Sequence, residues 1–155
     1  MLADPASLAT IGGGIALAGG LIGSAIGIAI AASAGAATLS QDRTQLRNVI
    51  ILAALPMSRA FYGIIILVIV LTVVVPELAT VPDGFAVLAC TLIAALSFGA
   101  SGAYQGSVCA SGISFLPKTK GKILPNSLML AVFVELIAIL GLVFTIMALS
   151  LRGLM

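Results

Sequence analysis

Four long apolar stretches, at about residues 8–35, 48–75, 84–115 and 124–151, decide what this chain can fold into. A helix that crosses a bilayer needs about 20 mostly apolar residues, and each stretch is long enough. Backbone N–H and C=O groups find no water in lipid, so a spanning segment must satisfy them internally as a helix. The sequence therefore predicts an all-α membrane protein with four transmembrane helices.

The composition agrees with this reading. Only 8% of the 155 residues are charged, against about 25% in a soluble globular domain, and a chain of this length has no aqueous core large enough for its apolar surface. The net charge of +2 gives no reason to expect a nucleic-acid partner. The chain has no His, and Cys90 and Cys109 are expected far apart on one helix, so we expect no metal and no resident cofactor. No basic residue precedes Arg43, so the first apolar stretch does not resemble a signal peptide.

The polar connections predict the orientation in the membrane. Segments 39–47 and 116–122 hold the basic residues, which are Arg43, Arg47, Lys118, Lys120 and Lys122, whereas segment 75–84 holds only the acidic Glu77 and Asp83. Basic connections stay on the cytoplasmic side, so the first and third connections are predicted there, with both termini outside. Arg152 near the C-terminus argues weakly against this. In a prokaryote the membrane would be the cell membrane.

The order of helix, basic connection and helix occurs twice. Sliding residues 48–64 onto 126–142 aligns several identical residues, and a shift one residue shorter does the same for the preceding helices. The aligned pairs are Asn48/Asn126, Leu52/Leu130, Ala53/Ala131, Ala60/Ala138, Gly63/Gly141, Ala18/Ala95, Ser24/Ser101 and Gly35/Gly112. The sequence thus predicts two tandem-duplicated hairpins, at 1–78 and 79–155. In this register Met57 stands where the second hairpin has Glu135.

Small residues recur every four positions in the first stretch, at Gly19, Gly23, Gly27, Ala31 and Gly35. Gly102, Gly106 and Ala110 repeat the pattern more weakly in the third stretch. Small residues at this spacing let helix backbones approach closely in lipid. One such pair would indicate ordinary helix packing, but five in a row favour a helix in the inner wall of a tight ring.

Three polar side chains interrupt the apolar stretches at one depth. Arg59, Gln105 and Glu135 each lie about 12 or 13 residues from the basic connections, or about 18–20 Å along a helix. An ionised group there costs on the order of 3 kcal/mol. A structural polar cluster is one interpretation. The other is an ion site, where a proton or Na⁺ intermittently cancels the charge of Glu135.

The segments "ALPMSRAFYG" (54–63), "AYQGS" (103–107) and "VELIAILG" (134–141) resemble the proteolipid K (c) subunit of V-type and A/V-type rotary ATPases. The resemblance covers almost the whole chain. It implies a non-catalytic subunit of a rotary complex, assembled with identical copies into a membrane ring, with the first and third helices inside and the other two outside. It also implies a central stalk at the cytoplasmic connections and a stator subunit that presents an arginine to the ring.

The resemblance implies a role for each matched position. Glu135 corresponds to the essential carboxylate, and Gln105 to a glutamine that binds Na⁺ in Na⁺-pumping members. Leu55 and Ser58 correspond to positions that offer a carbonyl and a hydroxyl. Arg59 departs from those members, which have glutamine there. Since a guanidinium is always charged, we expect it to reach Glu135 directly or through Gln105 and Ser58, and to favour transport of H⁺ over Na⁺. In the rival arrangement Arg59 points away from the site and Glu135 binds its ion unaided.

Three alternatives stay open on the sequence. A small four-helix, proton-coupled multidrug-type exchanger also has four spans and one membrane glutamate, but would need a substrate cavity lined by aromatic residues, which make up 5% of this chain. A membrane-embedded enzyme would need a nucleophile and base, a metal cluster or a phosphate-binding loop. A purely structural proteolipid would tolerate replacement of Glu135 by glutamine.

Overall fold

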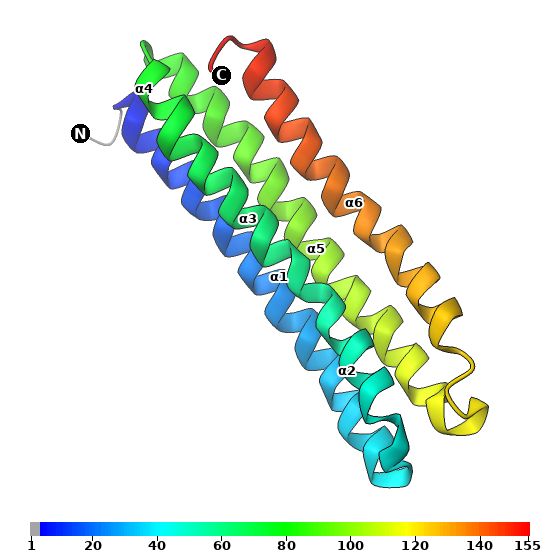
Figure 1. Cartoon of the computed structure of the whole chain (residues 1–155). Coiled ribbons are helices and arrows are strands. Elements are labelled where there is room, and N and C mark those ends of the chain that lie inside the picture. Colours follow the sequence, from blue (N-terminus) through cyan, green and yellow to red (C-terminus); the bar gives the residue numbers. More distant parts are fainter. Residues whose placement is uncertain (1–3) are drawn as a thin grey trace.

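The computed structural model describes residues 4–155 as long helices that run side by side along one axis (Figure 1). The first span is α1 (Pro5–Gln41), the third is α5 (Val81–Thr119) and the fourth is α6 (Leu124–Leu151). The second span is built from α2 (Leu46–Ala54), α3 (Ser58–Ile69) and α4 (Val75–Glu77), with short distorted turns between them. All four spans are long and apolar enough to cross a membrane, which confirms the predicted fold class.

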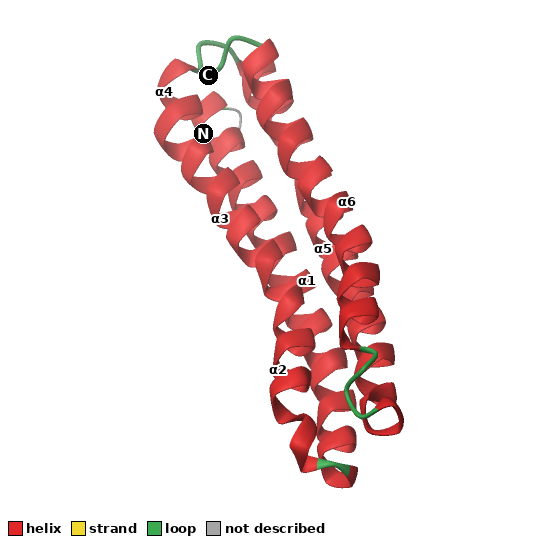
Figure 2. Cartoon of the chain, turned by 45° about the vertical axis from the view of Figure 1, so that its right-hand side comes forward, coloured by secondary structure: helices red, strands yellow, loops and turns green. Residues whose placement is uncertain are grey.

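The helices extend further than the sequence predicts. The predicted connection at 39–47 is helical as far as Gln41, and residues Arg43–Gln45 form the 3₁₀ turn η1. The predicted connection at 75–84 shrinks to residues 78–80 because Thr80 and Asp83 form a capping box and Pro82 fits the first turn of α5. Loops are therefore confined to the two ends of the bundle (Figure 2).

Asp42 terminates α1 at the first connection. Its carboxylate accepts hydrogen bonds from the Thr44 hydroxyl at 2.6 Å and the Thr44 N–H at 2.9 Å. These bonds, together with one from the Gln45 side chain, hold the pKa of Asp42 below its usual value. The helix α5 ends differently from α1. Lys120 and Gly121 both adopt positive φ and close α5 in a left-handed turn at the start of the third connection.

Two prolines break the second span, whereas α6 runs without interruption. Pro56 has no N–H to donate, and residues Leu55–Met57 tighten into the 3₁₀ turn η2. The Ser24 hydroxyl of α1 inserts there, donating to the Pro56 carbonyl at 2.8 Å and accepting from the Ala60 N–H at 3.1 Å. Further along, residues Val70–Val74 widen into the π-turn η3 just before Pro76. The break at Pro56 lies directly before the polar residues 58 and 59.

The glycine stripe of α1 packs against α5 of the same chain. A methyl group added at Gly23 would lie 2.8 Å from the Gly99 Cα, and one added at Gly19 would lie 2.7 Å from the Ala95 Cα. Gly102 on α5 meets the backbone of Gly23 in return. Ala31 is fully buried, and Gly27 and Gly35 face Pro56 and Val49 of the second span. The sequence predicted close approach of backbones correctly, but the structure places these contacts within one chain, and an inner ring wall stays a prediction.

Each remaining span packs on one of these two central helices. Gly63 brings α3 against α1, where a methyl group would lie 2.8 Å from the Leu17 Cα, and Gly141 brings α6 against α5, close to Ser97. The α6 helix contacts α5 along its length and α3 only locally. The start of α1 and the end of α6 lie at one end of the bundle, and the α1–α2 and α5–α6 connections lie at the other (Figure 1).

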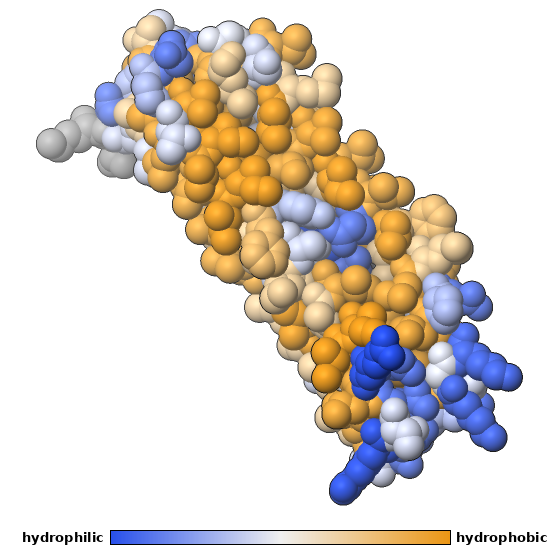
Figure 3. All heavy atoms as spheres, in the orientation of Figure 1, coloured by the Kyte–Doolittle hydropathy of each residue, from blue (hydrophilic) through white to orange (hydrophobic). Residues whose placement is uncertain are grey.

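The surface follows the same plan. Large apolar side chains are exposed along the outer faces of the helices, as in a protein surrounded by lipid or by other helices. Figure 3 shows an apolar body with hydrophilic residues concentrated at the end that carries the two basic connections. A smaller hydrophilic patch interrupts the apolar face about halfway along the bundle (Figure 3).

Candidate functional site

Glu135 projects from the middle of α6 toward α3 and α5, where four side chains donate hydrogen bonds to it. Its Oε1 accepts from the Ser58 hydroxyl at 2.8 Å and from the Tyr62 hydroxyl at 2.7 Å. Its Oε2 accepts from Arg59 Nη1 at 2.5 Å and from Gln105 Nε2 at 2.9 Å. The carboxylate is therefore satisfied on both oxygens by groups from two other helices.

Arg59 is fully buried, although its side chain is a guanidinium cation. Its Nη1 lies 2.5 Å from both Glu135 Oε2 and Gln105 Oε1, and 2.9 Å from the Ser58 hydroxyl. Its Nε donates to the Ser101 hydroxyl at 3.3 Å. Nη2 has no hydrogen-bond partner among residues 4–155. The sequence-based expectation that Arg59 contacts Glu135 thus agrees with the geometry.

Gln105 links the two charges and is itself almost fully buried. Its carbonyl oxygen accepts from Arg59, while its amide group donates to Glu135 and to the Ala131 carbonyl, the latter at 3.0 Å. Because Ala131 lies one turn before Glu135 on α6, this second bond fixes α5 against α6 at the height of the carboxylate. Gln105 therefore orients the Arg59–Glu135 pair and also makes one hydrogen bond to each member of it.

Ser58 contacts Glu135 directly, and Leu55 contacts Ser58. The Ser58 hydroxyl lies 2.8 Å from Glu135 and 3.3 Å from the Leu55 carbonyl, so its single hydrogen serves one of them at a time. The Leu55 carbonyl therefore reaches the site only through Ser58. All five predicted site residues gather in one place, with Leu55 at its margin.

The structure adds two residues that the sequence analysis missed. Tyr62 lies one turn beyond Ser58 on α3, and its ring packs on Phe98 with centroids 5.9 Å apart. Ser101 lies one turn before Gln105 on α5. Helical spacing from residues already singled out was the available signal, since side chains three or four positions apart share a face.

The charged pair is isolated from other charges. Arg59 and Glu135 form the one ion pair found in the described part of the chain. The remaining acidic residues, Asp4, Asp42, Glu77 and Asp83, lie at helix ends or connections. Glu135 keeps a side-chain exposure of 16% while Arg59 has none. The carboxylate thus lies at the rim of a polar cluster whose cation is sealed inside.

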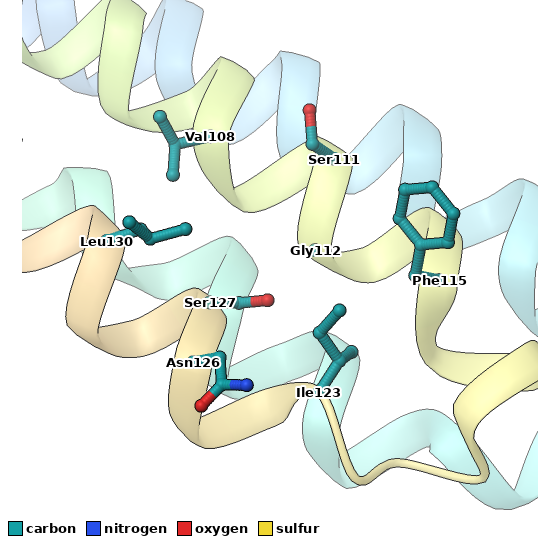
Figure 4. Close-up of a pocket in the computed structure, with 8 residues that line it drawn as sticks. All are labelled: Val108, Ser111, Gly112, Phe115, Ile123, Asn126, Ser127 and Leu130. Carbon is teal, nitrogen blue, oxygen red and sulfur yellow. The ribbon is translucent and has the colours of Figure 1, made fainter.

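A separate cavity of about 380 Å³ opens between α5 and the start of α6, nearer the basic connections. Its lining is mostly apolar, and Figure 4 shows Val108 on α5 and Leu130 on α6 on its two sides. Ser127 and Asn126 supply polar groups. Neither Glu135 nor Arg59 lines this cavity, so it is distinct from the polar cluster.

The chain has recognisable relatives among known proteins. Residues 11–70 and 88–148 match the family of the ATP synthase C subunit. The chain belongs to that family. The chain is also similar to the A-type ATP synthase subunit K of Methanocaldococcus jannaschii, at 29% identity over 148 residues. The match covers 96% of this chain but spans only 64% of the length of that relative.

Membership in this ATP synthase family confirms the proteolipid resemblance and accounts for the multi-pass membrane architecture. Each matched segment includes most of one helical hairpin: the first covers parts of α1 and the second span, and the second covers parts of α5 and α6. The family favours a rotor proteolipid over the multidrug-type exchanger, the membrane enzyme and the purely structural proteolipid. Glu135 lies inside the second matched segment and Arg59 inside the first.

Proposed function

We propose that this chain is a non-catalytic rotor-ring subunit of an A/V-type rotary ATPase that carries H⁺ across the membrane on Glu135. The observation that supports this most directly is a carboxylate midway along a membrane helix, held by four donors from two other helices. Family membership supplies the context in which such a carboxylate exchanges an ion. ATP turnover would take place in other subunits of the complex.

The contacts of Glu135 favour H⁺ over Na⁺ as the transported ion. Sodium needs several oxygen ligands, yet both carboxylate oxygens already accept from hydrogen-bond donors. The guanidinium at 2.5 Å occupies the side of Oε2 where a bound cation would be expected. Two cations so close repel each other strongly in surroundings of low polarity. A proton needs no ligand shell, and one lone pair of Oε1 becomes available to it when the Ser58 or Tyr62 hydroxyl turns away.

The proposed partners follow from the resemblance. Identical copies form the ring, a stator membrane subunit presents an arginine to passing Glu135 side chains, and central-stalk subunits bind the two basic connections. The hairpins 1–78 and 79–155 are proposed as products of duplication, and this is supported by Gly63 and Gly141, each of which faces the preceding long helix of its own hairpin. We place the first and third connections in the cytoplasm, at the cell membrane if the host is prokaryotic. No resident cofactor or metal is proposed.

The test is ATP-driven proton uptake by the assembled complex in lipid vesicles. Glu135→Gln keeps the size and polarity of the side chain but cannot exchange a proton, so uptake is expected to stop. Glu135→Asp is expected to retain part of the activity, with its charge displaced by about one methylene. Full coupled uptake by Glu135→Gln, or uptake of Na⁺ in place of H⁺, would contradict the proposal.

One cheap measurement separates this function from that of a multidrug-type exchanger. Native mass analysis in mild detergent is expected to show a large assembly of identical chains. A dimer would instead favour the exchanger.

A further inference from the structure

The turn that carries Ser58 and Arg59 contains a hydroxyl group from another helix. Ser24 of α1 donates to the Pro56 carbonyl at 2.8 Å and accepts from the Ala60 N–H at 3.1 Å. In an unbroken α-helix the N–H of residue 60 would donate directly to the carbonyl of residue 56. The Ser24 hydroxyl therefore stands inside the hydrogen-bond ladder of the second span.

We propose that Ser24 is a positioning residue of the ion site, because its bridge between Pro56 and Ala60 sets the pitch of the turn that aims Ser58 and Arg59 at Glu135. The inference rests on the proposed function, since it gives Ser24 a part in the exchange of an ion on that carboxylate. The hydrogen bonds of Ser24 go to backbone groups, so it acts on the site through the backbone of the second span.

The place of the bridge decides which side chains it controls. Ser58 and Arg59 lie between the two bridged groups, and Tyr62 follows one turn later on α3. These three residues supply three of the four donors to Glu135, and Gln105 of α5 supplies the other. A change in the pitch of this turn therefore moves most of the hydrogen bonds to the carboxylate at once.

Close packing fixes the Ser24 hydroxyl at the break. Its side chain is 5% exposed. About one turn away on each side, Gly20 and Gly27 bring the α1 backbone against the same segment. A methyl group added at Gly27 would lie 2.6 Å from Pro56 Cβ, and one added at Gly20 would meet the Arg59 carbonyl. The backbone of α1 thus holds the hydroxyl between its two partners.

The second hairpin offers a comparison within the same chain. Ser101 aligns with Ser24, and Val134 stands where the first hairpin has Pro56. The helix α6 runs without a break through this region, and Ser101 instead accepts from Arg59 Nε at 3.3 Å. The two aligned serines therefore serve the same arginine, Ser24 through the backbone and Ser101 through the side chain.

Ser24→Ala removes the bridge with little risk to the fold. Alanine is smaller than serine, and the Ala60 N–H can then donate directly to the Pro56 carbonyl, so neither backbone group needs to stay unpaired. The turn should tighten, and Ser58 and Arg59 should rotate away from Glu135.

The rate at which a carbodiimide labels Glu135 in the assembled complex, in lipid vesicles, tests this. Carbodiimides attack protonated carboxyls, so weaker contacts to the carboxylate should make labelling about threefold or more faster in Ser24→Ala. Ser24→Thr keeps the hydroxyl and should label at the natural rate. Ser33→Ala is the matched control, because the exposed Ser33 hydroxyl bonds to the Ala29 carbonyl of its own helix. Equal rates in Ser24→Ala and Ser33→Ala would overturn the proposal, as would labelling of Ser24→Thr as fast as that of Ser24→Ala.

Coupling to Arg59 separates positioning from a general loosening of the bundle. If Ser24 acts by aiming Arg59, Ser24→Ala should speed labelling by a smaller factor when Arg59→Gln is already present, because the cation that the bridge aims is then gone. A purely structural serine would give the same fold-change in both backgrounds, and that result would overturn the proposal.

Failure of this inference can be told apart from failure of the proposed function. If ATP-driven proton uptake requires Glu135 but Ser24→Ala labels like the control, the rotor function stands and the role of Ser24 is wrong. If proton uptake does not require Glu135, the proposed function itself is wrong.

Discussion

Tyr62 is the donor to Glu135 that can be deleted with the least disturbance, since neither charge of the site changes. Its hydroxyl lies 2.7 Å from Oε1, and its ring has a separate packing role against Phe98. Ser58 cannot be tested as cleanly, because the same hydroxyl also accepts from Arg59. At the scale of single residues, Tyr62 therefore isolates one hydrogen bond to the carboxylate.

Tyr62→Phe is expected to keep the fold and weaken the stabilisation of ionised Glu135. A hydrogen bond to a charged group contributes about 1.5–3 kcal/mol, and partial exposure reduces this here. Carbodiimide labelling of Glu135 should then be roughly tenfold faster, and proton uptake should be altered but not abolished. The matched control is Tyr104→Phe, since Tyr104 is 70% exposed on α5. Identical behaviour of the two variants would remove Tyr62 from the site.

At the scale of helices, the contact between α1 and α5 determines the shape of the subunit. Backbones meet there because glycines face glycines, with Gly102 and Gly106 of α5 lying on Gly23 and Gly27 of α1. Dispersion contacts between closely packed backbones are a main source of helix association where lipid supplies no hydrophobic driving force. The outer helices then attach to this central pair.

Gly23→Leu is expected to force α1 and α5 apart and to lower the free energy of unfolding in detergent by about 1–3 kcal/mol or more, comparable to overpacking a core. Neighbouring backbone atoms would lie 2.5–2.8 Å from the first added carbon. Gly14→Leu is the control, because a carbon added at Gly14 meets nothing within 4 Å in this chain. Equal stability of the two variants would show that the stripe is not a tight contact. If Gly14→Leu disturbs assembly alone, the exposed face of α1 contacts other chains.

For the molecule as a whole, the asymmetry of charge predicts its orientation. Lys118, Lys120, Lys122 and Arg43 lie at the end of the bundle that carries the first and third connections, and the α4–α5 connection lies at the other end. Single cysteines at Lys120 and at Ala79 should therefore react with an impermeant thiol reagent from opposite sides. Cys90 and Cys109 are replaced by alanine beforehand. Labelling of Lys120→Cys from outside the cell would reverse the assigned orientation.

The sequence alone determined the architecture, because each of its signals is local or periodic. Apolar length defined four spans, since a bilayer tolerates only helices of that length. Glycine spacing indicated close backbone contact, and counting residues from the basic connections placed Arg59, Gln105 and Glu135 at one depth. Helix ends were less predictable. Capping by Thr80 and Asp83 and the tolerance of proline in a first turn extended helix into segments that their composition marks as loops.

Which surfaces meet depends on how the helices pack in three dimensions. A repeat of glycines does not say whether its partner is the next chain or the same one, and the structure turned the stripe of α1 toward α5. Equal depth does not fix the rotation of three helices about their axes, so contact between Arg59 and Glu135 depended on the turn at Pro56 and on Ser24 packed into it. Tyr62 and Ser101 were missed for the same reason. Their role follows from the angle at which α3 and α5 face α6, a property of packing that no single segment encodes.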